Sequence, residues 1–279
     1  QLLRQYYFVG GMPEAVKVYV QTKNGQKVAK VHRSIVDTYK DDFSKYKTKM
    51  GVEKIASVFE LLPGHLGKKI KYSEILKDEK STTVNKIIDL FAKARIIHRC
   101  FHTNAMGIPL EAQKDESVFK LYFLDIGLLH HMLGLLPEDL LYEIPGEQLL
   151  TEGLAAEQFV AQHLAFAHGL EETPKLFYWL KDKKNKKAEL DFVISHGKKI
   201  FPVEVKSGKS GGLKSLFYFV STHSSSKAIR FDVKERTEKQ TIEPIKTTVA
   251  NQEKRQACNF TLLNIPIYLA EKVLEIVKE

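Results

Sequence analysis

The chain has 279 residues, of which 43% are hydrophobic and 28% are charged, and its net charge is +9 at pH 7. This length allows one large domain or two ordinary ones, and the composition is typical of a protein with a buried core. No stretch approaches the roughly 18 uncharged apolar residues of a membrane helix, and no signal peptide opens the chain. We therefore expect a cytoplasmic protein without a membrane partner.

The first residue and the two cysteines give further expectations. The chain begins with Gln1, and "QLLRQYYFVGGMPEAV" is typical of the interior of a longer protein, so we expect a fragment or a processed product. Cys100 and Cys258 have no CxxC spacing, which predicts neither a zinc site nor a disulfide framework. The positive charge fits nucleic acid or another polyanion as a partner, although a mildly basic charge also serves solubility alone.

Residues 11–60 are predicted to be largely helical. Apolar residues recur at spacings of three and four in "EAVKVYVQ" and in "KVHRSIVDTYKDDFSKY". Pro13 suits a first helical turn, and the Asn-Gly pair within residues 22–27 predicts a turn. We therefore assign residues 1–65 to a helical linker region.

Residues 66–140 have the element order of a winged helix-turn-helix. A short helix in "YSEILKD", capped by Ser73, precedes a longer one in "STTVNKIIDLFAKARII", opened by Ser81, Thr82 or Thr83. The segments "IIHRCFHT" and "VFKLYFLD" alternate like two strands, and the apolar helix "IGLLHHMLGLL" follows. Helix, turn, helix and hairpin in this order predict the winged helix.

Residues 145–279 are predicted to form a mixed α/β domain. A helix in "GEQLLTEGLAAEQFVAQHLAFAHG" ends at Gly169, and three strands follow in "KLFYWLKD", "AELDFVIS" and "KKIFPVEVKSG". Next come a helix in "LKSLFYFVSTH", a strand in "KAIRFDV" and a polar stretch, 236–256, which we expect to be a mobile loop. A strand and a closing helix in "FTLLNIPIYLAEKVLEIVKE" end the chain. The whole fold class is therefore α+β, with mixed α/β character.

Two groups of basic and polar side chains could contact nucleic acid. The first lies on the second helix of the winged-helix region and could enter a DNA major groove, although winged helices equally serve as rigid protein-binding modules. The second lies at the hairpin tip after "KLFYWLKD" and could touch phosphates, although a solvated lysine turn explains it as well. The first group is Asn85, Lys86, Lys93 and Arg95, and the second is Lys183, Lys184, Lys186 and Lys187.

The strongest chemical signal lies on two neighbouring strands. In "AELDFVI", Asp191 points to the opposite side from Leu190 and Phe192, and in "PVEVKSG", Glu204 and Lys206 share one face. Charged groups among apolar strand residues are costly to bury unless they are paired or bound to a metal. Two acids at the same level of adjacent strands would form an oxygen-ligand site for Mg²⁺.

Phosphodiester chemistry suggests a role for each of these residues. Asp191 and Glu204 would hold Mg²⁺ or Mn²⁺, which polarises the phosphate and lowers the pKa of a bound water. Lys206 would orient that water or stabilise the charge that develops on the phosphate. The Val205 carbonyl and Glu157, on the preceding helix, could supply further ligands. The plainer alternative is a β-hairpin with an exposed Asp191 and a Glu204–Lys206 pair along one strand face.

This pattern resembles a known nuclease superfamily. The acid in "ELD", the "E-V-K" thirteen positions on, and a helical glutamate upstream match the PD-(D/E)xK superfamily, although the first motif here is Leu-Asp rather than Pro-Asp. The resemblance implies a restriction-endonuclease-like α/β domain. It also implies metal-dependent cleavage of DNA phosphodiester bonds.

A wider resemblance covers nearly the whole chain. "GGMPEAV", "YKDDFSKY", "VFKLYFLDIGLL" and "TEGLAAEQFVAQHL" occur in this order. In this the chain is similar to the C-terminal half of bacterial and archaeal AAA-type ATPases that end in a domain of unknown function. The resemblance implies a P-loop ATPase domain as a partner within a full-length chain. No G-x-x-x-x-G-K-[ST] motif occurs here, so ATP would bind only in that other domain.

Together these observations predict the C-terminal region of an AAA-type ATPase, with a winged helix and a Mg²⁺-dependent DNA nuclease domain. A second interpretation keeps the nuclease fold but assigns it only to binding DNA or a protein partner. A third treats the chain as an oligomerisation and regulatory module of the ATPase, which would make it a homo-oligomer.

Overall fold

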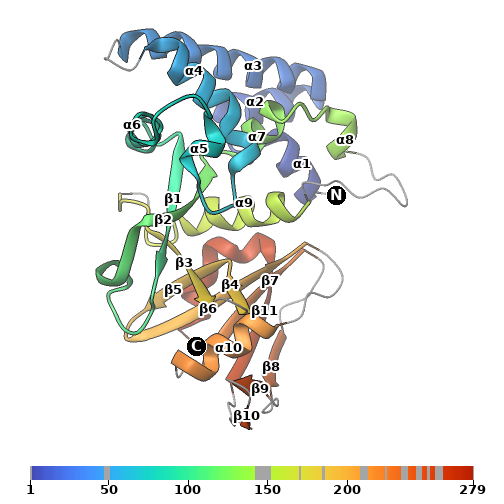
Figure 1. Ribbon diagram of the computed structural model, residues 1–279. Coiled ribbons are helices and arrows are strands. Elements are labelled where there is room, and N and C mark those ends of the chain that lie inside the picture. Colours follow the sequence, from blue (N-terminus) through green and yellow to red (C-terminus); the bar gives the residue numbers. More distant parts are fainter. Residues whose placement is uncertain are drawn as a thin grey trace. The chain divides into compact units, whose positions relative to one another are not determined.

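The computed structural model describes most of the chain as two compact units with α+β architecture. One unit comprises Gln1–Arg99 and Lys120–Gln162, and the other comprises Cys100–Phe119 and His163–Glu279. The predicted α+β class is confirmed, because helices are combined with two mixed sheets (Figure 1). The described residues are 2–46, 51–141, 152–169, 171–183, 186–207, 213–223, 225–233, 238–242, 247–249, 252–254 and 260–278.

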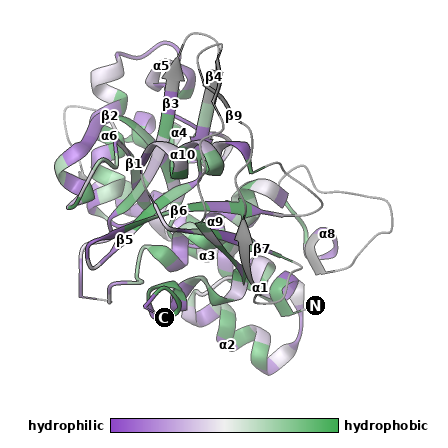
Figure 2. Ribbon diagram, turned by 90° about the horizontal axis from the view of Figure 1, so that it is seen from below, coloured by the Kyte–Doolittle hydropathy of each residue, from purple (hydrophilic) through white to green (hydrophobic). Residues whose placement is uncertain are grey.

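The first unit opens with the helices that the periodicity predicts. Pro13 is the first residue of α2, and Lys23 adopts a left-handed φ of 50° at the predicted turn. Asn24 then caps the next helix, since its side chain accepts a hydrogen bond from Lys27 N at 3.1 Å. Hydrophobic and hydrophilic residues alternate along α2 (Figure 2). The helices are α1 (Leu2–Val9), α2 (Pro13–Thr22), α3 (Gly25–Asp42), η1 (Phe43–Tyr46), α4 (Val52–Leu61) and η2 (Leu62–His65).

The winged-helix element order is also present. One capping prediction is wrong, however: Lys71 rather than Ser73 precedes α5, without a side-chain capping bond. Helix α6 begins at Ser81, one of the three expected openings, and Lys80 before it forms no side-chain capping bond. One face of α6 is buried, as an amphipathic helix requires. The elements are α5 (Tyr72–Ile75), α6 (Ser81–Lys93), β1 (Ile97–Thr103), η3 (Leu110–Gln113), β2 (Lys114–Phe123), α7 (Ile126–Met132), α8 (Pro137–Leu141) and α9 (Glu152–Leu164). Among the described helices, none is long and apolar enough to cross a membrane.

The "GGMPEAV" and "FLDIGLL" segments meet at one buried carboxylate of the first unit. Asp125 accepts hydrogen bonds from Gly11 N at 2.6 Å and from Leu128 N at 2.9 Å, and so caps α7. Burial raises the pKa of Asp125, while the hydrogen bonds from these backbone groups act in the opposite direction. Gln162 donates to the Tyr6 hydroxyl at 3.0 Å from the same region. These two segments therefore have a structural explanation that needs no ligand.

Two larger sheets supply most of the strands of the second unit, and β9 and β10 form a separate two-stranded sheet; the first residues of β1 and the last of β2 belong to the first unit. One has the order β2-β1-β3-β4 and the other β5-β6-β7-β11-β8 (Figure 1). Strand β6 pairs antiparallel with β5 and parallel with β7, and β7 pairs parallel with β11. The region 236–256, predicted to be a loop, contains three short strands. The elements are β3 (Leu176–Lys183), β4 (Lys186–Leu190), β5 (Phe192–His196), β6 (Lys199–Lys206), α10 (Lys214–His223), β7 (Lys227–Asp232), β8 (Glu238–Ile242), β9 (Thr247–Val249), β10 (Gln252–Lys254), β11 (Phe260–Pro266), η4 (Ile267–Lys272) and α11 (Val273–Ile276).

Helix α10 packs on one face of the five-stranded sheet. Its buried Leu216, Phe219 and Val220 form one core cluster with residues of β5, β7 and β11, among them Ala228 and Leu262. Trp179 belongs to the same cluster, so it serves the core, as an aromatic residue in a strand usually does. The apolar cluster covers the early part of the parallel strands β7 and β11. The charged residues near the carboxyl ends of β6 and β7 do not belong to this cluster, and they form the candidate site.

Candidate functional site

Asp191 lies in the bend between β4 and β5, beside the end of β6. Its Oδ2 accepts a hydrogen bond from Val205 N at 2.7 Å. The antiparallel register pairs Phe192 with Val203, so continuing it by one residue puts Asp191 opposite Glu204. The predicted apposition of the two acids on adjacent strands is therefore present, with Asp191 partly buried rather than exposed.

Glu204 and Lys206 form an ion pair along the same face of β6. Their side chains are 12% and 21% exposed, which limits how far water screens the pair. Alternation along the strand explains the contact, since residues two apart point to the same side. The lysine therefore neutralises the acid that would bind the metal.

Strand β7 adds a second pair of charges that the sequence interpretation missed. The parallel register places Arg230 beside Glu204 and Asp232 beside Lys206. Arg230 Nη2 lies 4.0 Å from Asp232 Oδ2, within the same strand. The four side chains thus alternate in sign both along and across the strands. In the sequence this pair is visible as two opposite charges two residues apart in "AIRFDV". The sequence of β7 does not show, however, that β6 is its neighbour in the sheet.

Glu157, the proposed further ligand, lies on α9 in the first unit. Its Oε2 accepts a hydrogen bond from the Tyr122 hydroxyl at 3.2 Å. The adjacent Gln158 is fully buried, and its amide bonds to both Phe123 N (2.8 Å) and Phe123 O (2.7 Å). Asp191, Glu204, Lys206 and Val205 all belong to the second unit. Glu157 therefore has a local contact within its own unit, and the core of the candidate site is formed without it.

The donor set fits a divalent cation with few protein ligands. Within the described ranges, no group of three or more His, Cys, Asp or Glu side chains could hold a metal ion. Asp191 and Glu204 provide two carboxylates, and Mg²⁺ is commonly held by one or two carboxylates together with waters and substrate phosphates. The Val205 N–H donates to Asp191 and so orients the first of these acids. Cys100 is buried and forms no disulfide, while Cys258 lies outside the described residues.

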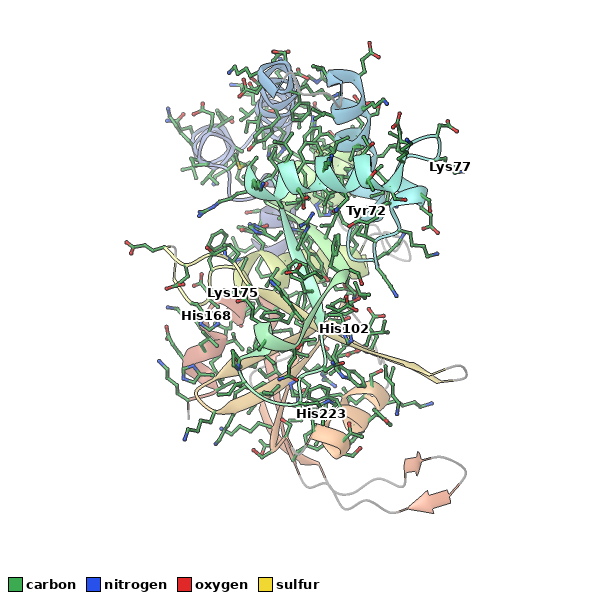
Figure 3. The ribbon with its side chains drawn as sticks, turned by 60° about the vertical axis from the view of Figure 1, so that its left-hand side comes forward. Tyr72, Lys77, His102, His168, Lys175 and His223 are labelled. Atoms are coloured by element: carbon green, nitrogen blue, oxygen red, sulfur yellow. The ribbon has the colours of Figure 1, made fainter. Side chains whose placement is uncertain are left out.

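The predicted nucleic-acid-binding residues fall into two classes. Lys86, Lys93 and Arg95 lie on or just after α6, where all three are exposed, and Arg95 has a left-handed φ of 58°. Asn85 accepts a hydrogen bond from the Tyr72 hydroxyl at 2.9 Å, and Tyr72 is labelled in Figure 3. The predicted lysine hairpin exists as the β3–β4 pair, with Lys183 opposite Lys186. Lys184 and the side chains of Lys183, Lys186 and Lys187 lie outside the described part of the chain.

A separate cavity of about 370 Å³ lies elsewhere in the second unit. Apolar residues such as Phe177 and Val193 line it together with His168 and Lys175, both labelled in Figure 3. Lys175 is paired with Glu111 at 2.8 Å. The residues that line this cavity include neither of the two acids of the candidate site.

Two models of known families match the chain, one after the other along the sequence. Residues 1–139 match the model of a domain of unknown function (DUF8612). Residues 152–264 match the model of another, DUF4143. The DUF4143 region contains Asp191, Glu204 and Lys206, and this domain is commonly found in AAA-ATPase-associated proteins. No curated protein and no solved structure matches the chain.

Proposed function

We propose that the DUF4143 region is a metal-dependent nuclease domain that cleaves phosphodiester bonds in DNA. The observation that carries this proposal is the 2.7 Å hydrogen bond from Val205 N to Asp191 Oδ2. It holds one carboxylate beside the strand that bears Glu204 and Lys206. The net charge of +9 supports a polyanionic substrate.

Each side chain has a distinct task in this proposal. A bound Mg²⁺ or Mn²⁺ would supply Lewis-acid activation of the phosphate and of a water. Asp191 and Glu204 hold the cation, and the Val205 N–H keeps the Asp191 carboxylate oriented. Lys206 donates hydrogen bonds to the developing negative charge on the phosphate. Because the lysine is already beside Glu204, it needs little rearrangement to act there.

The test is cleavage of supercoiled, linear and single-stranded DNA with Mg²⁺ or Mn²⁺. Three near-isosteric variants separate chemistry from folding: Asp191→Asn, Glu204→Gln and Lys206→Met. The amide oxygen that Asp191→Asn introduces can still accept from Val205 N, so this change removes charge while preserving the hydrogen bond. Each variant should lose at least about a hundredfold in cleavage rate, which corresponds to one lost transition-state contact. Cleavage by Asp191→Asn at the wild-type rate would overturn the assignment.

One specific observation favours a second function, a DNA- or partner-binding module without catalysis. Glu204 is neutralised by Lys206 and lies beside Arg230, so the acidic group is charge-balanced without any metal. Binding of DNA in the presence of a chelator, with no cleavage by the wild type under any metal condition, would establish this alternative.

The proposal extends to partners. An AAA-type ATPase is the expected partner, supported by the DUF4143 match, since that domain is common in AAA-ATPase-associated proteins. The solvent-accessible Lys86, Lys93 and Arg95 support DNA contact by the first unit as well. Replacing all three by Gln should weaken DNA binding without changing metal dependence, and unchanged binding would remove the winged helix from the proposed interface.

A further inference from the structure

Arg230 occupies a position in the candidate site that the proposed nuclease chemistry does not explain. Its Cα pairs with that of Glu204 on one side and with that of Asn264 on the other, so the three residues form one row across β6, β7 and β11. In a parallel pair, residues in register point to the same face of the sheet. The Arg230 side chain is 18% exposed, and it therefore lies at the border between the core and solvent.

Asn264, at the end of this row, is an unusual residue for its surroundings. Its side chain is 0% exposed, and within the described part of the chain neither Oδ1 nor Nδ2 has a hydrogen-bond partner. Leu262, two residues earlier on the same face, belongs to the apolar core cluster. An amide buried without partners destabilises a fold, whereas an aliphatic side chain of similar shape would not. Asn264 is therefore better explained by a role in binding than by a role in folding.

The neighbouring charges define what this row can bind. Arg230 presents a planar set of N–H donors that matches two oxygens of a phosphate group. Within the strand, its Nη2 lies 4.0 Å from Asp232 Oδ2. The apolar cluster beside the row, with Ala228 and Leu262 two residues earlier on the same face, lowers the local dielectric and strengthens such a contact.

We propose that Arg230 is the anion-binding residue of this site and contacts a non-bridging phosphate oxygen of the nucleic-acid backbone. Asn264, the register neighbour of Arg230 on β11, is the positioning residue: its amide oxygen, which accepts no hydrogen bond within the described part of the chain, accepts one from the guanidinium when Arg230 turns to that phosphate. The inference rests on the proposed function, because it names the same substrate class. It concerns binding, however, and so can be tested without any cleavage.

The experiment measures the affinity of the whole chain for a fluorescein-labelled DNA duplex by anisotropy, in Ca²⁺ and in EDTA, over a series of salt concentrations. Arg230→Gln should weaken binding about tenfold and lower the salt slope by about one phosphate contact. Arg230→Lys should recover part of the affinity, because it keeps the charge but not the planar donor set. The matched control is Lys199→Gln, which makes the same charge change at the exposed opposite end of β6. An Arg230→Gln protein that binds DNA as tightly as this control would overturn the proposal.

The role of Asn264 has its own readout. Asn264→Leu should unfold at the wild-type temperature or higher, because it removes an unpartnered buried amide. It should nevertheless weaken DNA binding, and it should have no further effect in an Arg230→Gln background. Loss of stability together with unchanged affinity, or additive effects of the two changes, would show that Asn264 does not position Arg230.

The two proposals fail in different ways. If no variant or condition supports cleavage but Arg230→Gln still loses affinity, the nuclease assignment fails and the phosphate site stands. If cleavage depends on Asp191 while Arg230→Gln binds and cleaves normally, the phosphate site fails and the nuclease assignment stands. Inorganic phosphate that displaces DNA from the wild type but not from the residual complex of Arg230→Gln would identify a phosphate oxygen as the shared ligand. Equal displacement from both proteins would contradict this.

Discussion

The carboxylate of Asp125 accepts a hydrogen bond from the backbone N–H of Gly11 at 2.6 Å, although 114 positions separate the two residues. The preceding Gly10 has a φ of 70°, and a Cβ built on it would lie 2.2 Å from Asp125 Oδ1. Glycine is thus required at position 10 by its backbone conformation and by the space that Asp125 occupies.

Replacing Gly10 by Ala should therefore destabilise the first unit by about 2 to 5 kcal/mol. About 1 to 2 kcal/mol comes from the left-handed conformation and about 1 to 3 kcal/mol from the overlap with Asp125. Gly134→Ala is the matched control, because Gly134 has a φ of 77° but a Cβ added there would meet no atom within 4 Å. Urea unfolding followed by circular dichroism should show a loss of about 1 to 2 kcal/mol for the control. Equal losses for the two variants would contradict the steric part of the argument.

Gln158 and Glu157 are neighbours on α9 but should respond differently to substitution. Gln158→Glu removes the N–H donor that reaches Phe123 O and buries a charge, so we expect a loss of about 3 kcal/mol or more. Glu157→Gln keeps an acceptor for the Tyr122 hydroxyl and should cost less than about 1 kcal/mol. Thermal unfolding of the two variants beside the wild type makes the comparison. A Gln158→Glu protein as stable as Glu157→Gln would refute the role of this amide.

His98 should make the stability of the first unit depend on pH. Burial, with a smaller contribution from the nearby Arg95, lowers the pKa of His98 to about 4. The unfolded chain binds this proton at about pH 6.5, so between about pH 6.5 and 4 the unfolded state holds more protons than the folded one. Stability should therefore fall as pH falls through this window, by at most about 3 kcal/mol from this residue.

The pH effect can be assigned to this histidine by comparing the wild type with His98→Leu in urea at several pH values. The variant should have a smaller slope over the same window. A residual slope is expected, because burial also lowers the pKa of His32 and of His130. An NMR titration that finds His98 protonated at about pH 6, just below the usual histidine pKa, would contradict the prediction directly.

Local patterns in the sequence predicted much of the fold, because they act over short distances. The periodicity of α3 and the alternation of β6 follow from which side of each element is buried. The apposition of Asp191 and Glu204 was accessible for the same reason, since β5 and β6 are consecutive strands joined by a short turn.

The missed features depend on contacts between distant segments. Arg230 and Asn264 enter the row only through the parallel pairing of β7 with β6 and with β11, and no local pattern shows which strands will be neighbours. Lys80, rather than a Ser or Thr, precedes the first residue of α6, because packing of the buried face of this helix stabilises it more than a side-chain cap would. The hydrogen bond between Glu157 and Tyr122 could likewise not be predicted, because it joins a helix to a strand 35 residues earlier.

The Glu204–Lys206 pair leads to a prediction in which metal affinity and activity change in opposite directions. In the absence of metal the lysine neutralises Glu204, so a divalent cation must compete with it for the carboxylate. Lys206→Met keeps much of the length of the side chain and removes that competition. The variant should bind Mn²⁺ several-fold more tightly than the wild type in calorimetry, yet cleave DNA more slowly, because the donor to the phosphate is lost. Lys199→Met, on the exposed end of the same strand, should change neither property. If Lys206→Met bound Mn²⁺ more weakly, the lysine would be supporting the carboxylates through their orientation, and its ion pair with Glu204 would be part of the metal-competent state.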